Sequence, residues 1–116
     1  MPDFGNPFSG LKNDRPLNEE ELIRAIRFVI SAEYEAVQLY TQLADSIKNS
    51  DVQKVLRDIA DEEIVHAGEF MKLLRDLNPE EQEFYNEGEK EVSELINKKA
   101  SISEYIRNFQ KILIKE

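Results

Sequence analysis

The sequence predicts an all-α fold in which two long helices form an antiparallel hairpin, half of a four-helix bundle, and two shorter C-terminal helices follow. Three observations support this fold. Helix-start signatures occur at four places along the chain, and apolar residues recur at steps of three and four in two long segments. The two segments also match each other when the chain is folded back between them.

The chain divides into three parts by composition. Residues 1–16 are rich in Gly, Pro and Asn, which predicts an irregular N-terminal arm. Residues 17–98 hold the hairpin and a third helix, and residues 99–116 form a C-terminal amphipathic helix. Each predicted helix begins with a polar side chain three residues before Glu or Gln, the spacing of a capping box. The pairs are Asn18 with Glu21, Ser50 with Gln53, Asn78 with Glu81, and Ser101 with Glu104.

The two long segments each carry a seam of the kind that packs helices in bundles. The first seam consists of Leu22, Ile26, Val29, Glu33, Ala36, Tyr40, Leu43 and Ile47. The second consists of Val52, Leu56, Ile59, Glu63, His66, Phe70, Leu73 and Leu77. In an antiparallel hairpin, residues equally far from the loop are neighbours. Pairing the first list with the second in reverse order gives position numbers that always add to 99, which centres the loop between Asn49 and Ser50.

The C-terminal part predicts two shorter helices. The third helix runs from Pro79, at a first helical position that suits proline, to about Asn97. The fourth carries an amphipathic stripe that needs a partner. The stripe consists of Ile102, Tyr105, Ile106, Phe109, Ile112 and Leu113.

Composition limits the function. The 116 residues carry a net charge of −9, which argues against nucleic acid or an anionic membrane as the partner. The sequence has no cysteine, so disulfides, thiolate metal sites and thiol nucleophiles are excluded. The sequence has neither a signal-peptide pattern nor a stretch long and apolar enough to cross a membrane, and we therefore expect a cytoplasmic protein.

Three ionisable residues interrupt the apolar seam at one level of the hairpin. Glu63 and His66 lie three apart and therefore on one face of the second helix, and the hairpin pairs His66 with Glu33 of the first. Burying carboxylates without a partner is unfavourable, so the three side chains are expected either to form ion pairs or to bind a cation. Carboxylates combined with imidazole suit iron, manganese or zinc. Glu33, Glu63 and His66 are therefore predicted metal ligands.

One chain offers only half of a di-iron site. A di-iron carboxylate centre in a bundle uses two Glu-x-x-His motifs and two further glutamates, whereas His66 is the sole histidine of this sequence. A two-fold axis through the seam would supply four glutamates and two histidines, and it would also cover the open face of the hairpin. The metal prediction therefore requires a homodimer with two ions.

The segments Ala32–Tyr40 (AEYEAVQLY) and Asp61–Ala67 (DEEIVHA) resemble the encapsulated ferritins, shortened members of the ferritin-like and rubrerythrin superfamily. This resemblance implies a ferroxidase that oxidises Fe(II) with O2 or peroxide at a di-iron centre between two subunits. It implies Glu33, Glu63 and His66 as iron ligands, Tyr40 as a residue close to the centre, and Glu35 as a residue of a secondary metal or entry site. Tyr40 is a candidate catalytic residue that could donate a hydrogen bond to a ligand carboxylate, or it could merely fill space in the seam.

The same resemblance implies the larger assembly. Dimers of such proteins form an open ring of ten subunits inside an encapsulin nanocompartment, which stores the oxidised iron. Two alternatives remain open at this stage. One is a metal-free helical oligomerisation module with a structural Glu–His cluster. The other is a rubrerythrin-like di-iron peroxidase, although no cysteine is available for the cysteine-ligated iron of such enzymes.

Overall fold

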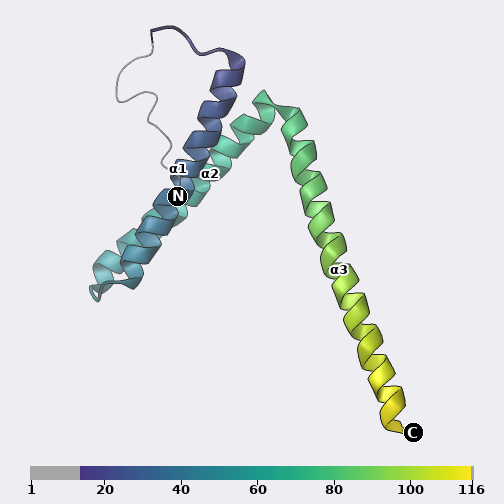
Figure 1. Ribbon diagram of the computed structural model, residues 1–116. Helices are drawn as coiled ribbons and strands as arrows, with labels where there is room; N and C mark the ends of the chain where they lie inside the picture. Colours follow the sequence, from purple (N-terminus) through teal and green to yellow (C-terminus); the bar gives the residue numbers. More distant parts are fainter. Residues whose placement is uncertain (1–13, 116) are drawn as a thin grey trace. The chain divides into compact units, whose positions relative to one another are not determined.

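The computed structural model describes residues 14–115, the side chains of 100 and 115 excepted. In this range the chain is helical almost throughout, with α1 over Glu19–Asp45, α2 over Ser50–Leu77 and α3 over Pro79–Lys115. Figure 1 shows α1 and α2 side by side as an antiparallel hairpin. The all-α prediction and its hairpin are confirmed; residues 1–13 of the predicted arm lie outside the described residues. None of the described helices has a stretch long and apolar enough to span a bilayer.

The capping box predicted at the start of α1 is present in full. The Glu21 amide donates to Asn18 Oδ1 at 2.9 Å, and the Asn18 amide donates to Glu21 Oε1 at 3.0 Å. Arg15 adds two hydrogen bonds to the Glu21 carboxylate, at 2.6 and 2.8 Å. The Arg15 guanidinium, followed by the Asn18 amide, lowers the pKa of Glu21 to about 2. The chain is therefore held at the point where it enters α1.

The turn between the helices lies where the sequence places it, but its cap is one residue earlier. Asn49 caps α2, because its Oδ1 accepts the amides of Asp51 and Val52 at 3.1 and 3.2 Å. Gln53 does not form the capping box with Ser50 that the sequence predicts. Its side-chain amide donates instead to the carbonyls of Ala44 at 3.0 Å and Ile47 at 2.6 Å.

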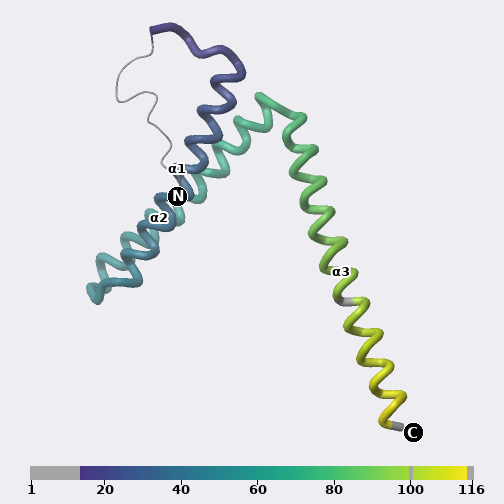
Figure 2. Tube along the Cα trace, in the orientation of Figure 1, coloured from purple at the N-terminus to yellow at the C-terminus, as the bar shows by residue number. Residues whose placement is uncertain are grey.

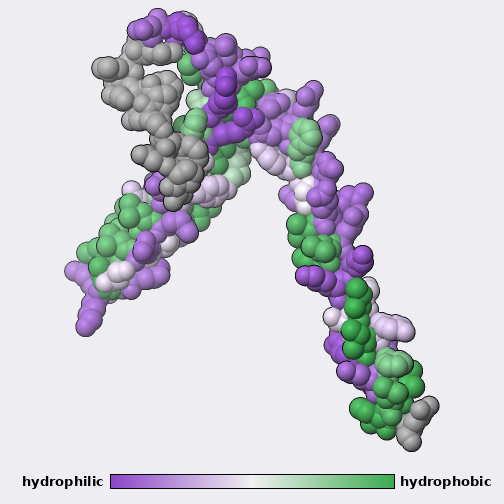
Figure 3. Space-filling view, in the orientation of Figure 1, coloured by the Kyte–Doolittle hydropathy of each residue, from purple (hydrophilic) through white to green (hydrophobic). Residues whose placement is uncertain are grey.

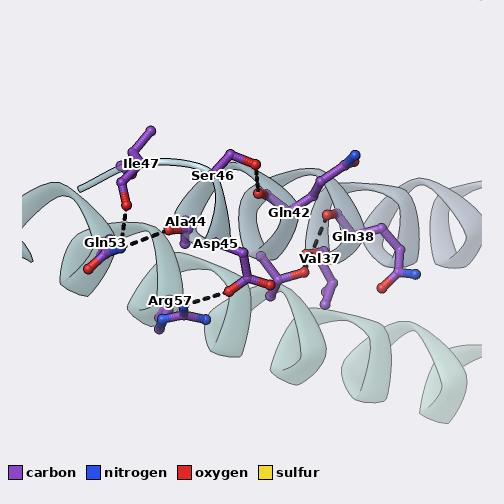
Figure 4. Close-up of polar contacts among 10 residues, drawn as sticks. Val37, Gln38, Gln42, Ala44, Asp45, Ser46, Ile47, Gln53 and Arg57 are labelled. Carbon is purple, nitrogen blue, oxygen red and sulfur yellow. Dashed lines mark hydrogen bonds and ion pairs between the residues drawn. The ribbon is translucent and has the colours of Figure 1, made fainter. Parts of the chain in front are cut away.

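Gln53 thus satisfies one carbonyl in the last turn of α1, where helical partners are lacking, and one in the turn that follows. Figure 4 shows this arrangement together with the nearby ion pair between Arg57 and Asp45, 2.7 Å. The hairpin therefore closes through side chains of α2 that reach back to the last turn of α1.

The buried core of the described residues is small and consists of Ala44, Ala60, Ala67 and Leu74. The three on α2 lie at steps of seven, which places them along one line of that helix. They stand next to the predicted seam positions Ile59, His66 and Leu73, not on them. Small alanine side chains let two helices approach closely, and the predicted seam is consequently half-open, with Leu43 and Leu73 almost half exposed. A hairpin with so little buried area gains stability from a partner.

The prediction of two shorter C-terminal helices is wrong. α3 is one helix of 37 residues that crosses the positions around Asn97 and Ser101 without a break, as the trace in Figure 2 shows. Ser101 and Glu104 are interior residues of this helix, so their spacing is not a cap. No proline or glycine occurs between Gly88 and the end of α3, so nothing in the sequence interrupts it. The chain has two compact units, one up to Leu77 and one from Asn78.

Candidate metal centre

The three ionisable seam residues converge halfway along the hairpin. Glu33 belongs to α1, and Glu63 and His66 lie one turn apart on α2. His66 Nδ1 is 3.8 Å from Glu33 Oε2 and 3.6 Å from Glu63 Oε2. One ligand atom from each residue lies within 4.8 Å of the others. The register deduced from the seams, which pairs Glu33 with His66, agrees with this contact.

The distances from His66 Nδ1 to the two carboxylate oxygens have the size expected for ligands around one ion. They exceed the 2.7–3.2 Å usual for a hydrogen bond. Two ligands bound about 2.1 Å from one metal ion, at a tetrahedral or trigonal angle, lie roughly 3.4–3.6 Å apart. A cation with two carboxylate oxygens and an imidazole nitrogen therefore fits the spacing with little movement of the side chains.

The burial of the three side chains is uneven. The Glu33 and Glu63 side chains are 17% and 19% exposed, whereas that of His66 is 46% exposed. Two neighbouring carboxylates that are shielded from water repel each other. The imidazole of His66 is the basic group that lies beside both of them. The cluster thus combines shielded carboxylates with a histidine on the open face of the hairpin, where a second chain can reach it.

The other two predicted site residues stand apart from this cluster. Tyr40 follows Glu33 by seven positions on the same face of α1, roughly 10 Å along the axis, and is partly buried. Within the described part of the chain, no hydrogen bond joins Tyr40 to the three residues. Glu35 is exposed, and its place two residues after Glu33 turns it to another side of the helix. Their catalytic and metal-binding roles stay predictions.

The residue that sequence reasoning overlooked here is Ala67. It follows His66 directly, is 2% exposed, and belongs to the line of small residues at which α2 is buried. Ala60 and Ala67 form the side of α2 that is buried against α1. Glu63 and His66 therefore lie toward the edge of the hairpin. The step of seven from Ala60 to Ala67 and Leu74 was the available signal.

Comparisons with known proteins agree with this architecture. A family model described as Rubrerythrin matches residues 25–116. A ferritin-like–encapsulin shell fusion protein of Pyrococcus furiosus is 40% identical over 94 residues, which are 81% of this chain and 27% of that protein. The encapsulin nanocompartment cargo protein EncC of Myxococcus xanthus is 40% identical over 76 residues, 66% of this chain and 58% of that protein. The chain thus spans well under two thirds of either relative.

A solved structure is similar over most of its length. The crystal structure of the encapsulated ferritin domain from Pyrococcus furiosus superimposes with a TM-score of 0.71 at 41% sequence identity. The match covers 79% of this chain and 93% of that domain. The similarity therefore extends over nearly all of that domain and about four fifths of this chain.

Proposed function

The chain belongs to the rubrerythrin family of ferritin-like proteins, and from this premise we propose that it is a ferroxidase whose di-iron centre forms between two chains. The observation that carries the proposal is the convergence of Glu33, Glu63 and His66 on the open face of the hairpin. Family membership supports iron as the metal, because a carboxylate-rich donor set suits iron and favours its ferric state.

The ligand count requires the second chain. Each chain contributes two carboxylates and one imidazole, and a two-fold axis beside the cluster doubles this to the set of four glutamates and two histidines. Glu33, Glu63 and their symmetry mates bind and partly neutralise two ferrous ions, and His66 provides the nitrogen ligand. The same contact covers the seam residues that the single hairpin leaves half exposed, so one interface serves both packing and iron binding.

Iron is the substrate of the proposed reaction. Two Fe(II) ions each give up one electron, and O2 with two protons takes up both to yield two Fe(III) and hydrogen peroxide. With peroxide as the oxidant, the two electrons and two protons yield two water molecules. The protein residues hold the ions close together and exclude other ligands, while the electrons come from the iron.

The relatives suggest the setting of this reaction. One is named a fusion to an encapsulin shell and the other an encapsulin cargo protein, and we propose that this chain is likewise enclosed in an encapsulin shell. An open assembly of chains can oxidise iron but cannot retain the product, so a surrounding shell supplies the storage space. Tyr40 and Glu35 are proposed to act near the centre and at a secondary metal site.

A rubrerythrin-like peroxidase is the second candidate, favoured by the family match. It differs from a ferroxidase in the fate of the iron, since a peroxidase returns its iron to the ferrous state and consumes peroxide without accumulating ferric iron. The absence of cysteine from this sequence removes the cysteine-ligated iron of such enzymes. We therefore rank the ferroxidase first.

Anaerobic titration of the purified protein with Fe(II), followed by admission of O2, tests the proposal. We expect about one iron per chain, corresponding to two ions per pair of chains. Ferric absorbance in the near ultraviolet should then grow over repeated additions of iron. Hydrogen peroxide added in place of O2 identifies a peroxidase, which would consume peroxide repeatedly without net ferric product. A metal-free oligomerisation module would bind no iron in the anaerobic step.

A further inference from the structure

The continuity of α3 creates a second, unused apolar seam. Because no break occurs near Asn97, the apolar residues before and after that point share one face of a single helix. They alternate at steps of three and four, the period of a coiled-coil seam. The seam of α3 consists of Val92, Leu95, Lys99, Ile102, Ile106, Phe109 and Leu113.

This seam is open to solvent. The six apolar members are each between 49% and 56% exposed, and every described side chain from 83 to 114 is exposed. Figure 3 shows hydrophobic side chains gathered along α3, most densely toward its C-terminal end. A row of large apolar side chains over three heptads, unlike scattered single residues, indicates a contact surface for another helix.

The charge of α3 changes sign along its length. Between 79 and 97 the helix carries seven glutamates and one lysine, a net charge of −6. Between 98 and 114 it carries four basic residues and one glutamate, a net charge of +3. The helix dipole favours this polarity only within the first and last turns, so it does not account for the charges in between.

We propose that α3 pairs with α3 of a second copy of this chain as an antiparallel coiled coil. In that orientation the acidic half of each helix lies along the basic half of the other, whereas a parallel pair would bring like charges together. Lys99 gives a second reason. In a parallel pair the two Lys99 side chains would face each other, whereas in an antiparallel pair Lys99 opposes an apolar residue of the partner, Leu95 or Ile102 according to the register.

A second copy is the occupant because α3 is complementary to itself in both period and charge. The seam from Val92 to Leu113 is roughly 30 Å long, which is sufficient for several layers of interlocking side chains. This contact uses none of Glu33, Glu63 or His66. It is therefore separate from the proposed iron-binding dimer and would join such dimers into larger assemblies.

Disulfide cross-linking in the full chain tests the pairing directly, because the sequence has no cysteine of its own. Chains with Val92→Cys are mixed with chains carrying Ile102→Cys or Phe109→Cys, oxidised, and analysed by mass spectrometry. In the two nearest antiparallel registers, Val92 opposes one of these two residues and lies about 15–25 Å from its own copy, beyond disulfide reach. We expect a mixed disulfide with one of the two. Self-linked Val92→Cys chains, or no cross-link at all, would overturn the proposal.

Reversing charges on α3 tests whether opposite charges on the two helices stabilise their antiparallel contact. Arg107 and Lys111 lie outside the seam, so Arg107→Glu with Lys111→Glu in the cross-linking chain removes the positive charge of the basic half without changing the packing surface. These changes should lower the yield of mixed disulfide roughly twofold or more at low ionic strength, where charges act over longer distances. Combining this chain with a Val92→Cys partner that carries Glu87→Lys and Glu91→Lys should restore the yield. The matched control reverses Lys48 and Lys54, two exposed residues of the hairpin unit, and should leave the yield unchanged. An equal loss in the control, or no recovery in the combination, would contradict antiparallel pairing.

Discussion

His66 of α2 faces Glu33 of α1 across the hairpin, with Nδ1 3.8 Å from Oε2. This contact joins the two helices at the level where Glu63 also approaches the imidazole. The pair converts a short Glu-x-x-His motif on one helix into a three-residue cluster. It also places this cluster on the side of the hairpin that the chain itself leaves half open.

Replacing Glu63 by Gln should abolish most iron binding, because it removes a charged ligand while preserving size. Loss of a residue that merely supports a metal ligand lowers affinity or activity about 10–100-fold, so loss of a ligand should cost at least as much. Glu62→Gln is the matched control, since Glu62 is the exposed neighbour of Glu63. Anaerobic Fe(II) titration and the initial rate of oxidation measure both variants. Equal effects of the two substitutions would remove Glu63 from the site.

Replacing Ala67 by Leu should destabilise the hairpin by about 2 kcal/mol, because the larger side chain has no space where α2 is buried. Ala32→Leu adds the same atoms at an exposed position of α1 and should change the stability little. Urea unfolding of the metal-free protein, followed by helical circular dichroism, compares the variants. Similar unfolding midpoints would show that the alanine line does not set the distance between the helices.

Replacing Gln53 by Ala should cost about 1–2 kcal/mol, since the carbonyls of Ala44, in the last turn of α1, and Ile47, in the turn after it, lose their donor. Gln38→Ala, an exposed position on α1, serves as the reference for lost side-chain volume. The effect should appear as faster amide hydrogen exchange in the last turn of α1. Unchanged exchange there would mean that water replaces Gln53 without penalty.

The low pKa of Glu21 predicts a pH dependence at the start of α1. Because its pKa falls from 4.5 to about 2 on folding, its contribution is fully present above pH 4.5 and disappears as the pH falls toward 2. In Glu21→Gln this contribution is absent at every pH. The difference in thermal stability between the two proteins should therefore shrink from pH 5 to pH 2. A constant difference over this range would contradict the role of Arg15 and Asn18 in holding the carboxylate.

Much of the hairpin could be predicted from the sequence because its cues are local or periodic. The start of α1 follows from the Asn18 capping box, and α3 starts at the proline where the sequence places a first helical position. The pairing of Glu33 with His66 follows from matching two seams about one loop. Membership of the family was likewise expected from the segments around Glu33 and Glu63, and it is confirmed.

Other features depend on the balance between competing interactions. Asn49 and Ser50 are both residue types that cap helices. Asn49 is the cap in the structure, and the Gln53 side chain, which a Ser50 capping box would use, donates to the Ile47 carbonyl instead. The Ser101–Glu104 spacing fits a cap and a helix interior equally well, and the flanking helix formers favour the interior. The buried line of alanines was missed because small residues contribute weakly to an apolar pattern although they decide how closely two helices pack.

The central claim is that two chains build one iron centre, and native mass spectrometry of the protein loaded anaerobically with Fe(II) tests it most directly. We predict that iron is carried by species with an even number of chains, two ions for every two chains, and that monomers produced by dilution carry none. The rate of oxidation per chain should fall on the same dilution. Monomers that retain iron and oxidise it at an undiminished rate per chain would contradict the claim.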